Sequence, residues 1–375
     1  LYYLADIADE FWVMADGEIR HKYTSGDAKT LSQEQLRALC LRTLNQENIP
    51  VPEKASPPHD APQALTVSDV RYTYGGKDRA ILSGMSFSVR EHEIVGLVGA
   101  NGCGKTTIGK VIAGLYRPSG GRIALFGKAQ KSKQLQKKIL FIMQEAEFQF
   151  FTNSVLNELQ YGHTITPEFE KRTEEILKNM GMWECRDRHP FSLSGGQMQK
   201  LTLMMAYLSD KPIVVLDEPT AGQDAESLAR CAALIRKMSK EKTVLIITHD
   251  LELIAGACDR CIGLADGRAE TEFSVRSVRE LQAVRQYMER FYPAAIPPKK
   301  KHRELFHPVT KLIFWLALLV VISTSDNHLV YAAYTALILL TAVDGWLGTA
   351  LAGGASFAVL WTANALFPNT VFSFM

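Results

Sequence analysis

The sequence lacks a charge excess of either sign, because 42 Lys and Arg residues stand against 40 Asp and Glu, a formal net charge of +2. A nucleic-acid partner is therefore not expected, since such proteins carry a basic surface. Cysteines are few, six in 375 residues. The lone C-x-x-C pair, Cys258 and Cys261, has no second pair, which argues against a zinc site. Scattered cysteines also fit reduced thiols better than a disulfide framework.

Long hydrophobic runs are missing from the first 300 residues and appear only after a basic cluster at 299–303. Apolar runs then occupy 312–322, 329–343 and 346–367. Each run alone is compatible with a buried core helix. Three in succession beside a Lys/Arg cluster favour membrane spans, with that cluster on the cytosolic side.

The most informative stretch runs from Gly99 to Thr107, with the spacing G-x-x-x-x-G-K-T. It follows a predicted strand at 94–98 and precedes a predicted helix at 108–115. Glycines let backbone N–H groups turn toward phosphate oxygens, and a helix N-terminus adds partial positive charge there. Lys105 can reach the β- and γ-phosphates, and the Thr106 hydroxyl can ligate Mg²⁺. The stretch predicts a nucleoside triphosphate site.

Polar side chains follow three further predicted strands. Asp217 and Glu218 follow the apolar run 213–216, His249 follows 244–247, and Gln144 follows 139–143. Open α/β sheets bind ligands at the carboxyl ends of their strands. We expect Asp217 to hold Mg²⁺ through water, Glu218 to polarise the attacking water and His249 to contact the γ-phosphate. Gln144 would reach the metal and the water.

Together with Leu193-Ser194-Gly195-Gly196-Gln197, these motifs make residues from about 64 to about 274 resemble an ATP-binding-cassette (ABC) nucleotide-binding domain. The resemblance implies an α/β P-loop NTPase fold: a RecA-like core with antiparallel β and α-helical subdomains, followed here by transmembrane α-helices. It implies ATP and Mg²⁺ as cofactors. ATP binding falls to Tyr74, Gly99, Asn101, Gly102, Cys103, Gly104, Lys105, Thr106 and Thr107. Catalysis falls to Glu218, His249 and Gln144, Mg²⁺ to Thr106, Gln144 and Asp217, the signature motif to Ser194, Gly195, Gly196 and Gln197, and the D-loop to Asp224.

Two positions within this resemblance leave alternatives open, and a third departs from the family pattern. Tyr74, at a strand end, is favoured over Tyr72 as the aromatic that stacks on adenine, and Tyr72 is then a core side chain. Cys103 is either a spacer or a thiol whose pKa the loop amides and Lys105 lower. Gln223 stands where the D-loop usually has leucine, without removing a needed functional group.

The first residues repeat a later segment: 1–17 align without a gap with 251–267, ending in Ala-Asp-Gly in both copies. A repeat of this period predicts a duplicated domain, with the first copy represented only by its last stretch. An unrelated strand-turn-strand is the alternative. We expect a remnant of an upstream cassette over 1–47, with a predicted helix at 31–44, and a Pro-rich linker over 48–63. A complete cassette would follow over 64–285, then a basic linker over 286–304 and a truncated helical membrane domain over 305–375.

The segment His307-Pro308-Val309-Thr310-Lys311-Leu312 resembles the start of the transmembrane T component of energy-coupling factor importers, and Gln149-Phe150-Phe151 is similar to a stretch of that family's ATPases. The resemblance implies an ATP-hydrolysing motor that drives uptake of a vitamin or metal ion. Its partners would be a second cassette, the T component and a separate substrate-capture protein in the cytoplasmic membrane, with the ATPase domain on the cytosolic face. The alternatives are another ABC transporter with fused membrane segments, or a soluble cassette tandem acting on ribosomes or DNA.

Overall fold

The computed structural model describes residues 8–15, 17–43, 49–55, 57–58, 60–75 and 80–291. These ranges all fall within one compact unit, Leu1–Ala294. Within them, no helix is both long and apolar enough to cross a membrane. The three apolar runs expected to span a membrane lie outside the described residues, as does the basic cluster that precedes them.

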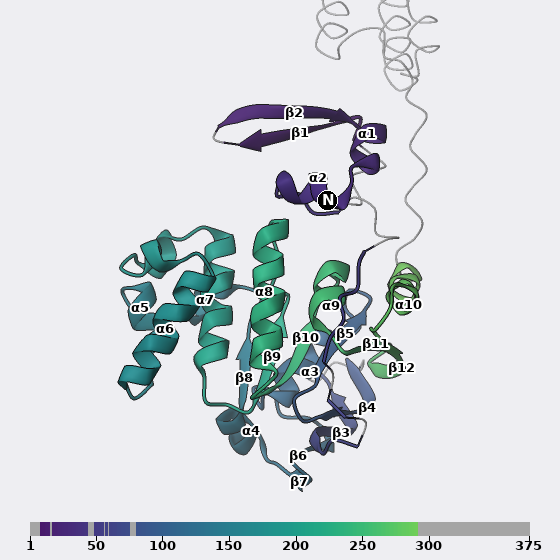
Figure 1. The fold of residues 1–375 in the computed structure, drawn as a ribbon. Helices are drawn as coiled ribbons and strands as arrows, with labels where there is room; N and C mark the ends of the chain where they lie inside the picture. The colour runs from purple at the N-terminus through teal and green to yellow at the C-terminus, as the bar shows by residue number, and fades with distance from the viewer. Residues whose placement is uncertain are drawn as a thin grey trace, which may run out of the picture. The chain divides into compact units, whose positions relative to one another are not determined.

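A six-stranded sheet forms the centre of the fold (Figure 1). In spatial order its strands are β12 (Arg268–Ser274), β11 (Arg260–Ala265), β5 (Ile94–Gly99), β10 (Thr243–Ile247), β9 (Ile213–Asp217) and β8 (Ile139–Ile142). Only β12 is antiparallel to its neighbour, and the other five strands are parallel. The four strands predicted at 94–98, 139–143, 213–216 and 244–247 are therefore confirmed. Their parallel pairing brings their carboxyl ends to the same edge of the sheet.

Alternate residues of the parallel strands enter two separate hydrophobic cores. In β9, Val214 and Leu216 belong to the core that contains buried helical residues between 155 and 288. Ile213 and Val215 belong to the other core, which contains buried residues between 64 and 135. All four are fully buried. Successive side chains of a strand point to opposite faces. A sheet covered on both faces therefore needs apolar residues throughout, which is why these strands appear in the sequence as continuous apolar runs.

The second sheet is four-stranded and antiparallel, in the order β4 (Leu82–Arg90), β3 (Gln63–Tyr72), β6 (Gly120–Leu125) and β7 (Lys128–Ala129). The helices are α3 (Lys105–Ile112), α4 (Ser132–Lys138), α5 (Val155–Gln160), α6 (Pro167–Asn179), α7 (Gly195–Leu208), α8 (Ala225–Met238), α9 (Leu251–Ala257) and α10 (Val278–Glu289). Short 3-10 helices occupy η3 (Ala146–Gln149), η4 (Trp183–Cys185) and η5 (Pro190–Ser192). The expected antiparallel β and α-helical subdomains are both present in the described residues.

An N-terminal hairpin consists of β1 (Glu10–Ala15) and β2 (Glu18–Thr24). Adding 250 to the residue numbers of β1 and β2 gives the bounds of β11 and β12. The cross-strand register is also the same in the two hairpins. Both carry an irregularity at the equivalent place, between Val13 and Met14 and between Gly263 and Leu264. The repeat in the sequence thus extends to the backbone pairing.

The helix expected over 31–44 is wrong in its bounds. Among the described residues of that range only the short helix α2 (Gln33–Ala38) stands, and another short helix, α1 (Ser25–Thr30), precedes it. The chain leaves α2 because Cys40 has φ 54 and the Leu41 N–H donates to the Leu36 carbonyl at 2.8 Å. This left-handed closure ends a helix even where apolar periodicity continues.

The Pro-rich linker is attached to the helices behind the central sheet. Ile49 is 3% exposed and belongs to the core of α7, α8 and α9. The Lys54 ammonium donates to the carbonyls of Ala255 at 2.8 Å and Cys258 at 2.7 Å, at the C-terminal end of α9. Cations are favourable there because the last carbonyls of a helix lack partners within it. Among the described linker residues, Ile49 and Lys54 are thus held against these helices.

Candidate active site

The phosphate loop, residues 99–107, connects β5 to α3. Helix α3 begins at Lys105, three residues earlier than expected, with Gly104 as its N-cap at φ 102. A Cβ at Gly104 would lie 2.8 Å from Leu82 Cδ2, so both conformation and space require glycine. Lys105 Nζ donates to the carbonyls of Gly99 and Ala100, each at 2.8 Å. The loop thus holds its ammonium group beside the helix N-terminus, an arrangement suited to phosphate.

Cys103 departs from one of the two roles considered for it. Its side chain is 9% exposed and belongs to the core beneath the second sheet. Burial raises the pKa of the Cys103 thiol, and the opposing effect of Lys105 is smaller. The expectation of a thiol with a lowered pKa is therefore wrong, because the side chain points into the core.

Three tyrosines gather where β3 ends. Tyr72 stacks on Tyr116, with ring centroids 5.3 Å apart and planes 5° apart. Tyr74 meets both rings edge-on and is 38% exposed. Its hydroxyl lies 3.3 Å from Thr107 Oγ1 in the phosphate loop. Of the two candidates for stacking on adenine, Tyr74 is thus the more exposed and lies beside the loop, while Tyr72 is the packed one.

Asp217 ends β9 and is 2% exposed. Burial raises the pKa of its carboxyl to about 6, opposed by a hydrogen bond from Thr106. A hydroxyl and a carboxylate are oxygen ligands of the kind Mg²⁺ takes, and a cation at this carboxylate would offset the cost of burying its charge. The described residues hold no cluster of three His, Cys, Asp or Glu suited to a metal. The fit to Mg²⁺ therefore rests on Thr106 and Asp217.

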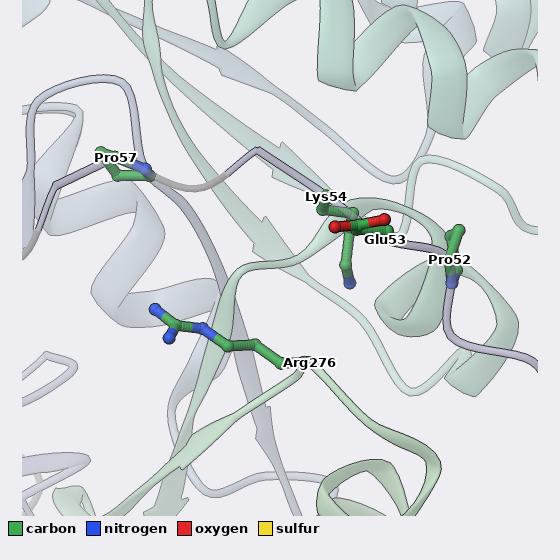
Figure 2. A pocket seen from close by; sticks show the side chains of 5 residues that line it. All are labelled: Pro52, Glu53, Lys54, Pro57 and Arg276. Atoms are coloured by element: carbon green, nitrogen blue, oxygen red, sulfur yellow. The ribbon is translucent and has the colours of Figure 1, made fainter.

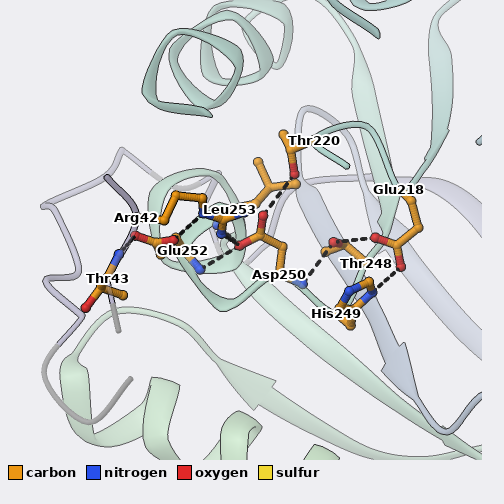
Figure 3. A network of polar contacts seen from close by, with 9 residues as sticks. All are labelled: Arg42, Thr43, Glu218, Thr220, Thr248, His249, Asp250, Glu252 and Leu253. Carbon is orange, nitrogen blue, oxygen red and sulfur yellow. Dashed lines mark hydrogen bonds and ion pairs between the residues drawn. The ribbon is translucent and has the colours of Figure 1, made fainter. Parts of the chain in front are cut away.

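Glu218 follows directly and is held in a sparsely populated backbone conformation, φ 48. Its N–H donates to the Ile247 carbonyl at 2.8 Å. Its side chain accepts from Thr248 Oγ1 at 3.1 Å and lies 2.8 Å from His249 Nδ1 (Figure 3). A left-handed residue other than glycine costs of order 1 kcal/mol or more and persists where neighbours fix it. The ends of β9 and β10 therefore aim a carboxylate and an imidazole at each other.

The hydrogen bond to Glu218 raises the pKa of His249, against a smaller opposing effect of burial. The His249 side chain is 65% exposed and that of Glu218 only 13%. The imidazole thus stands at the open side of the pair. Such a position lets it reach a ligand while its Nδ1 remains held by the carboxylate.

Gln144 lies just beyond β8, with an exposed side chain. Its backbone carbonyl accepts from Gln199 Nε2 of α7 at 2.7 Å. The Gln149 side chain bonds the backbone of Met143 on both its N–H and its carbonyl. The sequence motifs included Gln149 only as part of the family resemblance and did not include Gln199, whose contact joins segments 55 positions apart.

Ser194 caps α7. Its Oγ accepts from the Gln197 N–H at 3.3 Å, while Gln197 Oε1 accepts from the Ser194 N–H at 3.0 Å. This reciprocal capping box satisfies the backbone N–H groups of Ser194 and Gln197 at the start of α7. Gln223 donates to the Gly196 carbonyl at 2.8 Å, so the residue that departs from the usual D-loop braces the signature motif. Asp224 caps α8 through the Ser227 N–H at 2.7 Å.

The structure thus brings the predicted residues into two groups. Lys105, Thr106, Asp217, Glu218 and His249 gather at the carboxyl edge of the central sheet. The signature residues and the D-loop form the second group. In the part of the chain that the structure describes, the hydrogen bonds of 194–197 run to neighbours other than the phosphate loop.

A pocket of about 370 Å³ is lined by residues that belong to neither group (Figure 2). Its lining comes from the Pro-rich linker and the turn before α10: Pro52, Glu53, Lys54, Pro57 and Arg276. None of these residues belongs to the predicted motifs.

All six cysteines are free. Cys258 and Cys261 pack against Gly96 of β5.

Comparison with known proteins gives a family match and many curated relatives. The ABC transporter family profile matches residues 82–221. An ABC transporter ATP-binding protein of Treponema denticola is 31% identical over 290 residues, which cover 76% of this chain and 58% of that protein. The HMP/thiamine import ATP-binding protein YkoD of Bacillus subtilis is 37% identical over 244 residues, 63% of this chain and 42% of that protein. The chain thus spans about half the length of these relatives.

A shorter relative matches over most of its length. The energy-coupling factor transporter ATP-binding protein EcfA of Carboxydothermus hydrogenoformans is 31% identical over 228 residues, 58% of this chain and 84% of EcfA. Among solved structures, the cassette MJ0796, a dimer in a post-hydrolysis state bound to ADP and Pi, is 26% identical with a TM-score of 0.51. That match covers 57% of this chain and 99% of the cassette.

Proposed function

This chain belongs to the family of ABC transporter ATP-binding proteins, and we propose that it is the ATP-hydrolysing motor of an importer of the energy-coupling factor type. The observation that carries the proposal is the group at the sheet edge, where the Glu218–His249 pair lies next to buried Asp217 and its partner Thr106. Similarity to EcfA over most of that protein's length supports the importer class.

In the proposed reaction, Lys105 and the first amides of α3 bind the β- and γ-phosphates, and Tyr74 stacks on adenine. Thr106 and Asp217 would hold Mg²⁺, which would offset phosphate charge when bound. Glu218 accepts a hydrogen bond from water and aims its oxygen at the γ-phosphorus. The new P–O bond forms as the bond to the bridging oxygen breaks and the water passes a proton to Glu218, giving ADP and phosphate. His249 contacts the γ-phosphate, held by Glu218.

Two cassettes would share each ATP. The signature group and the phosphate loop make no hydrogen bond to each other among the described residues, so a signature group from a second cassette would complete the site. Dimeric MJ0796 supports this arrangement. The hairpin β1–β2, equivalent in bounds and register to β11–β12, supports the proposal that 1–47 belongs to such a second cassette, with 48–63 as linker and 64–285 as the complete cassette.

A membrane component would dock beside Gln144. Phe148, Phe151 and Tyr161 are 70%, 76% and 64% exposed, and Phe151 stacks on Tyr161 at 6.2 Å. Exposed aromatics gathered in this way mark interaction sites. We assign the surface to a T component, with a separate capture protein for a vitamin or metal ion. The cassette would then lie on the cytosolic face of the cytoplasmic membrane.

The specific rate of phosphate release tests the shared-site proposal. If two cassettes build each site, the rate per chain rises with protein concentration in Mg-ATP, and light scattering shows association over the same range. Lys105→Ala should abolish release. Robust, concentration-independent turnover by a demonstrated monomer would contradict the shared site.

A further inference from the structure

Arg42, which precedes the cassette in the sequence, contacts the segment that follows the switch histidine. One guanidinium nitrogen lies 2.5 Å from Asp250 Oδ1, and Nε lies 2.6 Å from Glu252 Oε2. The Arg42 and Asp250 side chains are 24% and 9% exposed. The Thr43 N–H also donates to Glu252 at 3.2 Å. Charge-assisted, two-pronged contacts of this burial are geometrically specific, unlike an exposed ion pair.

Asp250 connects this contact to the catalytic pair (Figure 3). The Asp250 N–H donates to Thr248 Oγ1 at 3.1 Å, and Thr248 Oγ1 donates to Glu218 Oε2 at 3.1 Å. Thr220 Oγ1 donates to Asp250 Oδ2 at 3.1 Å. Two hydrogen bonds through Thr248 therefore connect the backbone N–H of Asp250, the residue whose carboxylate Arg42 contacts, with the carboxylate proposed to orient water.

The same carboxylate begins α9. Asp250 Oδ1 accepts from the N–H groups of Glu252 and Leu253 at 3.1 and 3.2 Å. At the other end of α9, Lys54 binds the last carbonyls. We call the described residues 42–43 and 49–55, the end of the segment 1–47 and the start of the Pro-rich linker, the linker strap. The strap contacts α9 at both ends: Arg42 binds the carboxylates of its N-cap and first turn, and Lys54 binds the carbonyls at its C-terminal end.

We propose that Arg42 is a positioning residue for hydrolysis: through Asp250 it holds the loop 248–250, and with it Glu218 and His249, in the reactive arrangement. The inference rests on the proposed ATPase function. If Arg42 has this role, the rate of ATP hydrolysis depends on whether the linker strap is bound to α9. It then also depends on the segment before residue 42. The nucleotide itself is bound by other residues, Lys105 and the phosphate loop.

Without Arg42, Asp250 would still cap α9 but would lose the guanidinium group that contacts its carboxylate. The loop 248–250 would then be held less firmly and would adopt other positions. Misplacement of a catalytic group by about 1 Å can lower the rate of the chemical step by up to about 100-fold. The affinity for nucleotide, which other residues supply, should change little. For Arg42→Met in the full chain, kcat for Mg-ATP should therefore fall by roughly tenfold while KM changes by less than about twofold. Arg42→Lys keeps the charge without the planar fork and should give an intermediate kcat.

Two variants serve as controls. Glu252→Gln weakens the outer prong and leaves the Arg42–Asp250 contact, so its kcat should stay within about twofold of the wild type. Arg172→Met breaks another arginine–carboxylate pair, Arg172–Glu241 at 2.9 Å, which has no link to the switch loop. It should lower stability without changing kcat.

Hydrogen exchange gives a readout that needs no turnover. In Arg42→Met the amides of Asp250, Glu252 and Leu253 should exchange faster, with strands β9 and β10 unchanged. An inactive wild type would overturn the proposed function and leave this exchange test in force. If the wild type hydrolyses ATP and Arg42→Met matches it in kcat, or if the three amides are equally protected in both, the assignment of Arg42 is overturned.

Discussion

Glu218 Oε1 and His249 Nδ1 face each other at 2.8 Å across the ends of two adjacent strands, β9 and β10. The two residues are 31 positions apart in the sequence. Parallel pairing of Asp217 with Ile247 brings the following residues to the same edge. A partly buried carboxylate and an exposed imidazole thus form one unit, in which the carboxylate raises the pKa of the imidazole.

Glu218→Gln should lower the pKa of His249 relative to the wild type, because the hydrogen bond to Glu218 is the main cause of its elevation. A folded-state pKa above the ordinary 6.5 means that the pair stabilises the protein fully below about pH 6.5 and loses this contribution as pH rises through the folded value. NMR titration of the His249 ring, assigned with His249→Asn, measures the shift. An unchanged His249 titration in Glu218→Gln would refute the pair.

Asp217→Asn should stabilise the protein without Mg²⁺ or nucleotide at neutral pH. The folded-state pKa of about 6 lies above the ordinary 3.8, so the folded protein pays a growing penalty as pH rises from about 4 to 6, and all of it above that. The gain should be on the order of 1–3 kcal/mol at about pH 8 and close to zero at about pH 4. Thermal unfolding at both pH values measures it, and an equal gain at both would contradict this cause.

Cys103 should react with alkylating reagents much more slowly than exposed Cys40. Burial and a raised pKa both lower the thiolate fraction that attacks. We expect a difference on the order of tenfold or more, resolved by mass mapping of iodoacetamide adducts over time. Cys103→Ser should keep ATP binding, because the loop supplies backbone donors there. Labelling of Cys103 as fast as Cys40 would mean that the thiol faces the phosphate site.

Tyr74→Ala should weaken ATP binding, since stacking of a base on an aromatic ring contributes about 1–3 kcal/mol. Tyr74→Phe removes only the hydroxyl near Thr107 and should bind ATP within about twofold of the wild type. Calorimetric titration with Mg-ATP compares the two. If Tyr72→Ala weakens binding while Tyr74→Ala does not, the adenine contact belongs to Tyr72.

The sequence was sufficient where chemistry and local pattern coincide. The segment from Gly99 to Thr107 joins β5 to α3 as predicted, because the G-x-x-x-x-G-K-T spacing specifies the turn between them. Helix α3 begins earlier than predicted, at Lys105. Asp217, Glu218 and His249 follow strands that their apolar runs reveal. Each prediction needed only a strand, its end and the residue type found there.

Contacts between distant segments were beyond such reasoning. Nothing near Cys103 in the sequence tells that its side chain turns into the core, and nothing near Arg42 points to Asp250, 208 positions away. Gln223 looked like a neutral departure until its bond to Gly196 was seen. These roles arise from tertiary packing, which local pattern does not encode.

Phosphate release by Glu218→Gln tests the central claim most directly. The full chain should be assayed with Mg-ATP at concentrations where the wild type turns over, alongside nucleotide binding. Removing the carboxylate that orients water should lower kcat on the order of 10²–10³-fold with ATP still bound. Hydrolysis by Glu218→Gln near the wild-type rate would contradict the account, because the pair at the ends of β9 and β10 would then not carry the chemistry.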